Sequence, residues 1–255
     1  MASRTPLVIT PLPDMPAVSE GDDLTRLILT GLEASGIAIT DGDVIAMAQK
    51  IVSKAEGRAV RLADVTPSRR ARELAATAQK DPRLVELILG ESVEVLRCRP
   101  GVIIVEDRRG FVMANAGIDA SNVTVDGETV LLLPENPDAS AEGLRDDLQA
   151  RTGVNIGIVI IDSFGRAWRL GTTGTAIGVA GVPGLIDMRG HPDMNGRPLL
   201  TTELGVADEL AAAASLVMGQ ADERTPVVHM RGFPYPLCKG SARELVRART
   251  MDLFR

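Results

Sequence analysis

The 255-residue chain has few of the residues on which many common protein sites depend. Its two cysteines, Cys98 and Cys238, have no CxxC spacing, which argues against a disulfide framework and against a common zinc motif. Its two histidines, His191 and His229, lie in no HxxxH or HExxH pattern, so neither a zinc enzyme nor a histidine-based acyl-transfer triad is expected. His229 lies in an apolar run and is expected to be structural. His191 lies in a loop rich in glycine and proline and is equally compatible with a structural and a catalytic role.

Aromatic residues and positive charge are also scarce. Phenylalanine, tyrosine and tryptophan together make up 2% of the chain, and the formal net charge is −6. Binding to nucleic acid needs dense lysine and arginine for the phosphates, and single strands also need aromatic rings for stacking. We therefore expect no nucleic-acid partner. An anionic small molecule would have to be bound by local basic residues and by metal ions.

Long apolar runs are missing as well. No stretch approaches the roughly 20 apolar residues of a membrane-spanning helix. Pro6, Pro11, Pro13 and Pro16 interrupt any apolar core of a signal peptide. These features predict a cytoplasmic protein without a membrane partner. With 45% hydrophobic and 24% charged residues, the chain is long enough to bury a substantial core.

Apolar periodicity and turn signals predict a mixed α+β chain rather than a regular βαβ series. Helices are expected over residues 22–33, 66–79 (with Thr66 as N-cap), 81–90, 140–152 and 202–218, and a capping box at Ser241–Glu244 predicts one more. Strands are expected over residues 44–48, 94–99, 102–106, 111–113, 130–133, 156–161 and 227–230. The segment Pro134–Ser140 is the best candidate for a boundary inside one unit that spans residues 1–255.

The glycine-rich segment Gly171–Gly181 invites comparison with phosphate-binding loops. It lacks the lysine of the GxxxxGK[ST] loop and the glycine order of the GxGxxG fingerprint. We interpret it as a glycine-assisted strand or tight turn near a site. Neither a P-loop nor a Rossmann nucleotide site is predicted.

Two acidic turns are more informative. Residues 115–122 carry Asp119 close to hydroxyl and amide side chains, and residues 160–166 carry Asp162 directly before Ser163. Carboxylate, hydroxyl and amide oxygens are the ligands that Mg²⁺ and Mn²⁺ prefer. Either aspartate alone is as well explained as the cap of its own turn. Together they predict a divalent-metal site, provided that the two turns meet in space.

Nearby basic residues are candidates for binding an anionic ligand. Lys54 follows an expected strand in the small, turn-forming segment Ser53–Arg58, where a phosphate can approach closely, although a solvated surface lysine is the usual alternative. One charge pair at about 4 Å and an effective dielectric near 20 is worth roughly 4 kcal/mol before desolvation. Arg166 and Arg169 flank Trp168 and are candidates for further anionic groups. Trp168 itself is expected to be a packing residue rather than a ring-stacking one.

Several segments, in order along most of the chain, match one known family. They are Glu20–Leu24, Asp41–Asp43, Ser53–Arg58, Asn115–Asn122, Asp162–Arg166, Asp193–Arg197 and Val206–Glu209. On these residues the chain resembles the coenzyme F-420-0:L-glutamate ligase family, the γ-glutamyl ligases that finish the deazaflavin coenzyme. The resemblance implies an unusual α+β γ-glutamyl-ligase fold of two interleaved lobes, an intertwined homodimer and, for this chain, no additional C-terminal flavin-binding domain.

The resemblance also implies an activity. A GTP-dependent ligase would add L-glutamate, and further γ-linked glutamates, to F-420-0 through an acyl phosphate in coenzyme F-420 biosynthesis. It would use Mg²⁺ or Mn²⁺, and a monovalent cation as well. No side chain is implied as nucleophile or general acid–base, because the enzyme would only position metals and phosphates. The rival classes are a metal-dependent nucleotide phosphohydrolase and a non-catalytic nucleotide-binding protein.

Site residues follow from the same resemblance. Asp119 and Asp162 would hold one metal, and Ser163, in place of a common threonine, would lie at a second. Gln220 stands where an acidic ligand of the second metal is expected, and its amide brings an oxygen but no charge. The implied nucleotide contacts are Met15, Pro16, Ala17, Val18, Gln49, Lys50, Lys54, Asn122, Met218, Gly219, Ala221, Asp222, Glu223, Arg224 and Thr225.

Overall fold

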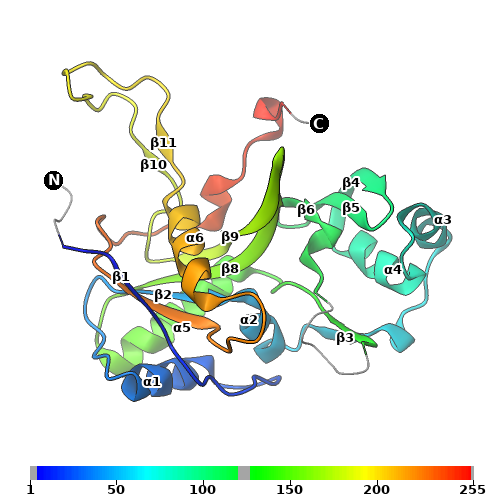
Figure 1. Cartoon of the computed structure of the whole chain (residues 1–255), viewed down its shortest axis with the longest axis horizontal. Helices are drawn as coiled ribbons and strands as arrows, with labels where there is room; N and C mark the ends of the chain where they lie inside the picture. Colours follow the sequence, from blue (N-terminus) through cyan, green and yellow to red (C-terminus); the bar gives the residue numbers. More distant parts are fainter. Residues whose placement is uncertain (1–4, 120–126, 254–255) are drawn as a thin grey trace.

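The computed structural model describes residues 5–119 and 127–253 and has a five-stranded mixed sheet at its centre (Figure 1). The strands lie in the order β1-β12-β2-β8-β9, where β2 and β8 are parallel and every other neighbouring pair is antiparallel. The remaining strands form a three-stranded sheet, β4-β5-β6, and two ribbons, β3-β7 and β10-β11. This arrangement confirms the mixed α+β class and the absence of a regular βαβ series.

The elements have the following bounds. The main sheet contains β1 Val8–Pro11, β2 Val44–Ala48, β8 Gly157–Arg166, β9 Arg169–Ala180 and β12 Val227–Arg231. The other strands are β3 Ala59–Arg61, β4 Ser92–Arg99, β5 Val102–Asp107, β6 Val112–Ala114, β7 Thr129–Leu131, β10 Ile186–Asp187 and β11 Glu203–Leu204. The α-helices are α1 Leu24–Ala34, α2 Gln49–Ala55, α3 Arg69–Ala78, α4 Pro82–Gly90, α5 Pro137–Thr152 and α6 Val206–Met218.

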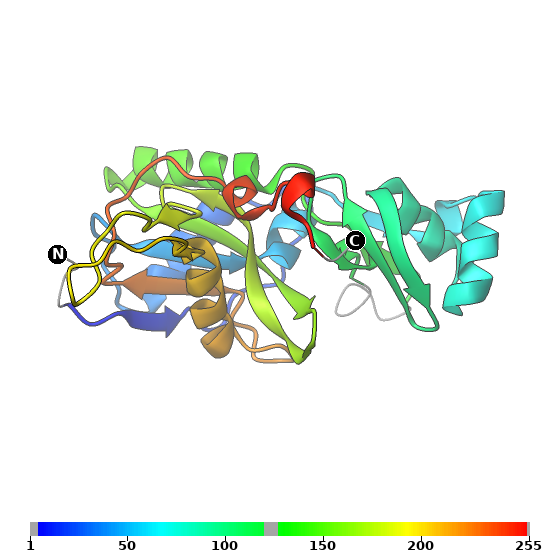
Figure 2. The same cartoon turned by 90° about the horizontal axis from the view of Figure 1, so that it is seen from above.

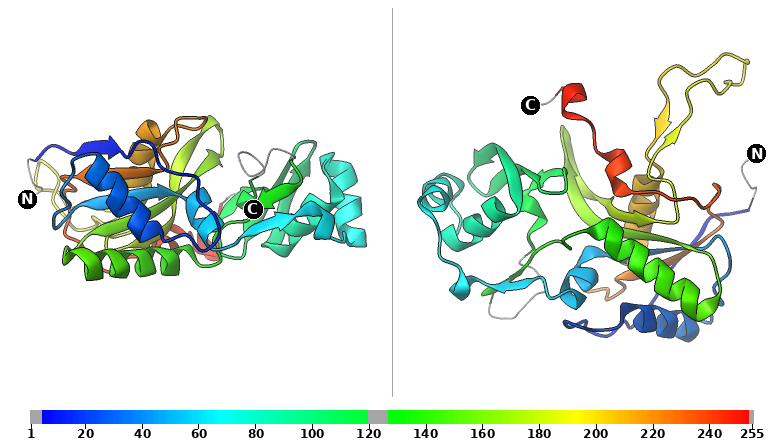
Figure 3. Two further views of the ribbon diagram at one scale, coloured as in Figure 1. Left: turned by 90° about the horizontal axis from the view of Figure 1, so that it is seen from below. Right: turned by 180° about the vertical axis from the view of Figure 1, so that it is seen from behind.

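Helices cover both faces of the main sheet. α6 lies in front of it in Figure 1, whereas α5 and α1 lie on the opposite face, seen from behind in Figure 3. A β-bulge between β8 and β9 lets two glycines of β9 face opposite ways. A Cβ at Gly174 would lie 2.4 Å from the carbonyl oxygen of Ala211 in α6, and one at Gly178 would lie 2.3 Å from that of Pro137 in α5. Both helices can therefore pack directly on this edge strand.

Two hydrophobic clusters hold the chain together. The larger surrounds the main sheet, and β2 within it is an unbroken apolar run, as expected for a strand covered on both faces. The smaller cluster lies among α3, α4 and the three-stranded sheet, at the end of the elongated molecule in Figure 2. None of the helices in the described residues combines the length and apolar character that a membrane crossing requires. The interleaved lobes, the boundary at Pro134–Ser140 and the homodimer stay predictions.

Several expected element boundaries are wrong in an instructive way. The helix expected from Thr66 begins at Arg69, because the hydroxyl of Ser68 accepts the Ala71 N–H and caps it. The helix expected from Thr202 begins only at Val206, after the short strand β11. The capping box of Ser241 and Glu244 is present, but the turn that it opens is a 3₁₀ turn over Ala242–Leu245 rather than an α-helix.

Other elements follow the sequence closely. The strand expected over residues 44–48 is β2, and the helix starting at Asp81-Pro82 is α4, with Asp81 as its N-cap. The glycine-rich segment is the strand β9, as interpreted. Sequence patterns missed β1, β3, β10, β11 and the short helix α2. The last omission matters, because α2 carries part of the candidate site.

A buried charge cluster joins β2 to β12 and gives His229 its role. The His229 Nε2 atom lies 2.9 Å from Oδ2 of Asp43, and Arg231 donates from Nε to Oδ1 at 2.9 Å. Burial raises the pKa of Asp43, but the hydrogen bonds from Arg231 and His229 outweigh burial and hold it below its ordinary value of 3.8. The structural interpretation of His229 is thereby confirmed.

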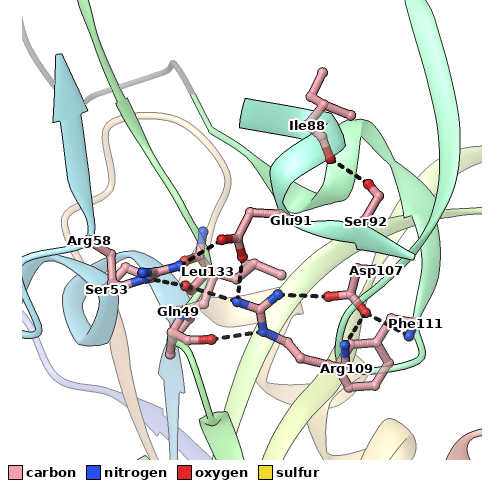
Figure 4. A network of polar contacts seen from close by, with 11 residues as sticks. Gln49, Ser53, Arg58, Ile88, Glu91, Ser92, Asp107, Arg109, Phe111 and Leu133 are labelled. Atoms are coloured by element: carbon pink, nitrogen blue, oxygen red, sulfur yellow. Dashed lines mark hydrogen bonds and ion pairs between the residues drawn. The ribbon is translucent and has the colours of Figure 1, made fainter. Parts of the chain in front are cut away.

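A second network, drawn in Figure 4, ties α4 and the three-stranded sheet to the segment after α2. Arg109, with 8% of its side chain exposed, pairs with Asp107 and with Glu91 at 3.0 Å each, and donates to the carbonyl oxygen of Pro134. Glu91 also accepts from Arg58, whose Nε donates to the carbonyl oxygen of Leu133. Two arginines and two carboxylates thus neutralise one another at the junction between the two clusters.

We predict that Arg109→Met lowers the free energy of unfolding by about 3–5 kcal/mol, because it leaves the buried carboxylate of Asp107 without its ion-pair partner and leaves Glu91 with Arg58 alone. Chemical denaturation monitored by circular dichroism measures this loss. The matched control is Arg69→Met, which removes an exposed pair with Glu73 and should change stability by less than about 0.5 kcal/mol. Equal losses in the two variants would contradict the role assigned to the network.

Asp43 generates a prediction about pH. Because its folded-state pKa lies below the unfolded value, its ionised form contributes stability above pH 3.8, and this contribution is lost as the pH falls through the folded-state pKa. Asp43→Asn should therefore cost about 3 kcal/mol at pH 7, and this cost should shrink progressively as the pH falls below 3.8. Urea denaturation at pH 7 and at a series of pH values from about 4 to about 2 tests this, with the exposed residue Asp146 changed to Asn as control. A gap between wild type and Asp43→Asn that stays constant through the series would rule the explanation out.

Candidate functional site

A cavity of about 770 Å³ opens at one edge of the main sheet. The carboxyl ends of β1 and β2, the middle of β8 and the start of β12 meet there, because Pro11 pairs with Val228, Val227 with Met47, and Met47 with Ile160. Clefts of 300–1,000 Å³ at such edges commonly hold small-molecule ligands. The lining residues are Asp14, Met15, Pro16, Ala17, Ala48, Gln49, Lys50, Ile51, Lys54, Ile161, Asp162, Ser163, Met218, Gly219, Gln220, Ala221, Asp222, Glu223, Arg224, Thr225 and Pro226.

The helix α2 supplies the lysines of the cavity. The small neighbours of Lys54 predicted a loop, but Lys54 lies near the C-terminal end of the helix α2. This helix follows β2 without a loop. Lys50 lies four residues earlier, and residues four apart share one face of a helix. Ser53 holds Gln49 in place by donating to its Oε1 at 2.8 Å. Two ammonium groups are thus presented to the same side of the cavity.

The two acidic turns meet at Lys50. Its Nζ lies 2.8 Å from Oδ2 of Asp119, and its charge also acts on Asp162. Burial raises the pKa of Asp162 to about 6. The Ser163 N–H and Lys50 lower this pKa, while the negative charge of Asp119 raises it further. The backbone of Asp119 is fixed by reciprocal hydrogen bonds with Leu131. Chain segments more than 40 residues apart therefore place two carboxylates close enough to repel each other.

The second group of oxygen donors lies beside the first. Ser163 donates from Oγ to Oε1 of Gln220 at 2.8 Å, and Gln220 donates from Nε2 to Oγ of Ser215 at 3.2 Å. Gly174 of β9 makes this possible, because a Cβ there would lie 2.6 Å from that of Ser215. The close packing of α6 on β9 thus brings the segment after α6 to Ser163, in the middle of β8.

The loop after α6 has its own internal order. Glu223 accepts the Ala221 N–H at 2.8 Å, and this backbone hydrogen bond lowers the pKa of the Glu223 carboxyl. Gly219 has φ +77°, and a Cβ there would lie 2.2 Å from Cδ of Glu223. Thr225 donates from its hydroxyl to the carbonyl oxygen of Met218. The carboxylate of Glu223 therefore shapes the loop, and Gly219 leaves the room for it.

Some expected site residues lie elsewhere. Val18 is 7% exposed and packs in the larger hydrophobic cluster instead of lining the cavity. Asn122 lies outside the described residues. Trp168 is 81% exposed at the end of the β8–β9 hairpin, so its interpretation as a packing residue is wrong. Arg166 and Arg169 are exposed beside it and do not line the cavity.

Further residues of the cavity escaped the sequence patterns. Asp14, Ala48, Ile51, Ile161 and Pro226 line it in addition to the expected positions. Each is adjacent in the chain to an expected residue, and only the strand pairing reveals that they converge. The exposed residue His191 lies in the segment that joins β10 and β11, and is not among the lining residues.

The donor set fits a hard divalent cation. Two carboxylates, one hydroxyl and one amide offer oxygen only, and Mg²⁺ typically takes one or two carboxylates and leaves its other positions to water and phosphate. A cation would also offset the repulsion between Asp119 and Asp162. Within residues 5–119 and 127–253, no group of three or more His, Cys, Asp or Glu side chains is arranged to hold a metal. A transition-metal site built by protein ligands alone is thus not indicated there.

Comparison with known proteins identifies the family. The family model described as F420-0:Gamma-glutamyl ligase matches residues 14–232. The chain is 48% identical to the coenzyme F420:L-glutamate ligase of Methanothermobacter thermautotrophicus, over 94% of this chain and 96% of the relative. It is 44% identical to that of Methanopyrus kandleri over the full length of both, and 43% identical to that of Methanococcus maripaludis over 95% of each. The chain belongs to the F420-0:gamma-glutamyl ligase family.

Proposed function

We propose that the protein is a GTP-dependent ligase that joins L-glutamate to the deazaflavin F-420-0 in coenzyme F-420 biosynthesis. Family membership and the names of the relatives support glutamate ligation to the coenzyme. The observation that carries the nucleotide-dependent route is the cavity at the end of β2 and the middle of β8, where Lys50 and Lys54 line the wall together with Asp162 and where Lys50 pairs with Asp119. Its volume suits a nucleoside triphosphate, and its apolar wall suits a base.

Ligation needs an activated carboxyl group, and the proposed chemistry has two steps. A terminal carboxylate oxygen of F-420-0 attacks the γ-phosphorus of GTP, forming an acyl phosphate and releasing GDP. The α-amine of L-glutamate then attacks the acyl carbon, phosphate leaves, and the amine loses a proton as the amide forms. Phosphoryl transfer of this kind depends on positioning and charge neutralisation, so no protein nucleophile is required.

The side chains have separate parts in this route. Lys50 and Lys54 would bind phosphate oxygens from one face of α2. Asp119 and Asp162 would hold one divalent ion and Ser163 with Gln220 a second, which would neutralise phosphate charge. The loop after α6 would contact the nucleoside across from Met15 and Pro16. Lys50 also neutralises Asp119, so the carboxylate stays compatible with a nearby triphosphate.

One assay separates the proposal from its rivals. Purified protein is incubated with GTP, Mn²⁺, L-glutamate and F-420-0, and mass spectrometry counts the added glutamates while released phosphate is measured. A ligase releases phosphate in step with glutamate addition. Phosphate release without glutamate or F-420-0 would indicate a phosphohydrolase, and no release under any condition would indicate a binding protein.

We predict that Asp119→Ala and Asp162→Ala each abolish turnover while the protein stays folded, because each removes a carboxylate that would hold the metal. Turnover by mass spectrometry and unfolding temperature by circular dichroism measure the two effects. Asp64→Ala, at an exposed position in a 3₁₀ turn outside the cavity, is the control and should keep full activity. Full activity of either site variant would contradict the assignment of Asp119 and Asp162 as metal ligands.

Lys54→Ala should raise the KM for GTP more than the KM for L-glutamate, by about tenfold if one phosphate contact worth ~1.4 kcal/mol is lost. Steady-state kinetics with each substrate varied in turn measures this difference. Lys80→Ala, near the end of α3 and away from the cavity lining, is the matched control. A similar rise in both KM values would argue against a phosphate role for Lys54.

A further inference from the structure

The hairpin of β8 and β9 leaves the main sheet beyond the candidate site. β8 is buried from Gly157 to Ile161 and becomes progressively exposed from Asp162 to Arg166. The two strands stay paired to the end, where Arg166 is the partner of Arg169. In Figure 1 they rise as a long curved pair of green strands. The same strand thus carries a metal-binding candidate at its middle and an exposed tip at its end.

The tip has a composition that its own packing does not explain. Trp168 is 81% exposed and has φ +58°, a left-handed backbone that is uncommon for a bulky residue. Arg166 and Arg169 lie directly opposite each other, and like charges in such pairs destabilise a hairpin. In the part of the chain that the structure describes, neither arginine forms an ion pair, and the hydrogen bond of Arg166 goes to the carbonyl oxygen of Leu170. In a protein of net charge −6, these two cations suit an anionic ligand.

The distance from the site to the tip matches the acceptor of the proposed reaction. Arg166 lies four residue steps beyond Asp162 along β8, or about 13 Å at ~3.3 Å per residue. F-420-0 is a flat tricyclic ring joined through a polyol and a phosphodiester to its terminal carboxylate. About ten covalent bonds separate the ring from the carboxyl carbon, which is ~12 Å in an extended chain with bonds near 1.5 Å. An acceptor whose carboxylate reaches Asp162 can therefore place its ring at the tip.

We infer that the β8–β9 tip is the binding platform for the deazaflavin acceptor, with Trp168 stacking on the tricyclic ring and Arg166 and Arg169 binding its anionic chain. This inference rests on the proposed ligase function and adds the acceptor's binding residues to it. Aromatic stacking on a flat ring and cationic side chains beside it are the two interactions that such a molecule offers. The acceptor would then lie along β8, with its reacting carboxylate at the cavity and its ring away from the nucleotide.

The test is a comparison of KM values. Trp168→Ala should raise the KM for F-420-0 about tenfold and leave the KM for GTP and for L-glutamate within twofold, because only the ring stack is lost. Trp168→Phe should recover most of the affinity. Leu170→Ala is the matched control, since Leu170 is 99% exposed on the same tip and should change no KM. Calorimetric titration of each variant with F-420-0 gives the dissociation constant directly.

Variants of the two arginines provide a second test of the platform. Arg166→Ala and Arg169→Ala should each weaken F-420-0 binding and reduce its dependence on salt concentration. An unchanged affinity for F-420-0 in Trp168→Ala, or an equal rise in all its KM values, would overturn the platform while leaving the ligase function intact. A wild-type protein that binds GTP but adds no glutamate would instead count against the proposed function itself. Circular dichroism confirms that each exposed-residue variant is folded.

Discussion

The parallel pairing of β2 and β8 is the constraint on which the candidate site depends. It sets Ala48 opposite Ile161, so that α2 and the polar half of β8 begin at the same level of the sheet. Lys50 and Asp162 consequently face the same cavity although they are more than 100 residues apart. A shift of this pairing by one residue would turn every side chain of β8 to the other face. The fully buried apolar side chains of both strands make such a shift costly.

The candidate site holds two carboxylates in place against their mutual repulsion. Burial is the main cause of the raised pKa of Asp162, and the negative charge of Asp119 adds to it. The fold does not relieve the repulsion by separating them, because Leu131 fixes the backbone of Asp119 and the pairing with β9 fixes Asp162. Lys50 offsets part of it. The neutral clusters around Arg109 and Asp43 lie outside the cavity lining and join the elements that carry the site, so the site keeps a charge arrangement suited to cations.

The sequence predicted those parts of the candidate site that can be identified from neighbouring residues along the chain. Asp119, Asp162 and Ser163 are identifiable because each stands at the end of an apolar run beside other oxygen donors. Their meeting at Lys50 is not local, since it depends on the strand order β12-β2-β8. Lys54 was assigned to a turn because its neighbours are small, yet burial of Ile51 and Val52 against the core stabilises a helix there. Trp168 was expected to pack rather than to stack on a ring, and no sequence pattern shows that its hairpin extends beyond the sheet.

Under the proposed function, the single strand β8 serves two substrates. β8 needs apolar residues where α5 and α6 cover it and polar residues where it leaves their cover, and the change occurs at Asp162. β9 follows it with glycines at Gly174 and Gly178, which bring both helices close on either side of the bulge. The helices therefore cover β8 up to Ile161, whereas the hairpin beyond them packs through Phe164 against Phe111 and exposes Arg166, Trp168 and Arg169 at its tip. At the tip, the like-charged pair of Arg166 and Arg169 costs stability and Trp168 exposes a large apolar ring, which favours a binding role for these residues.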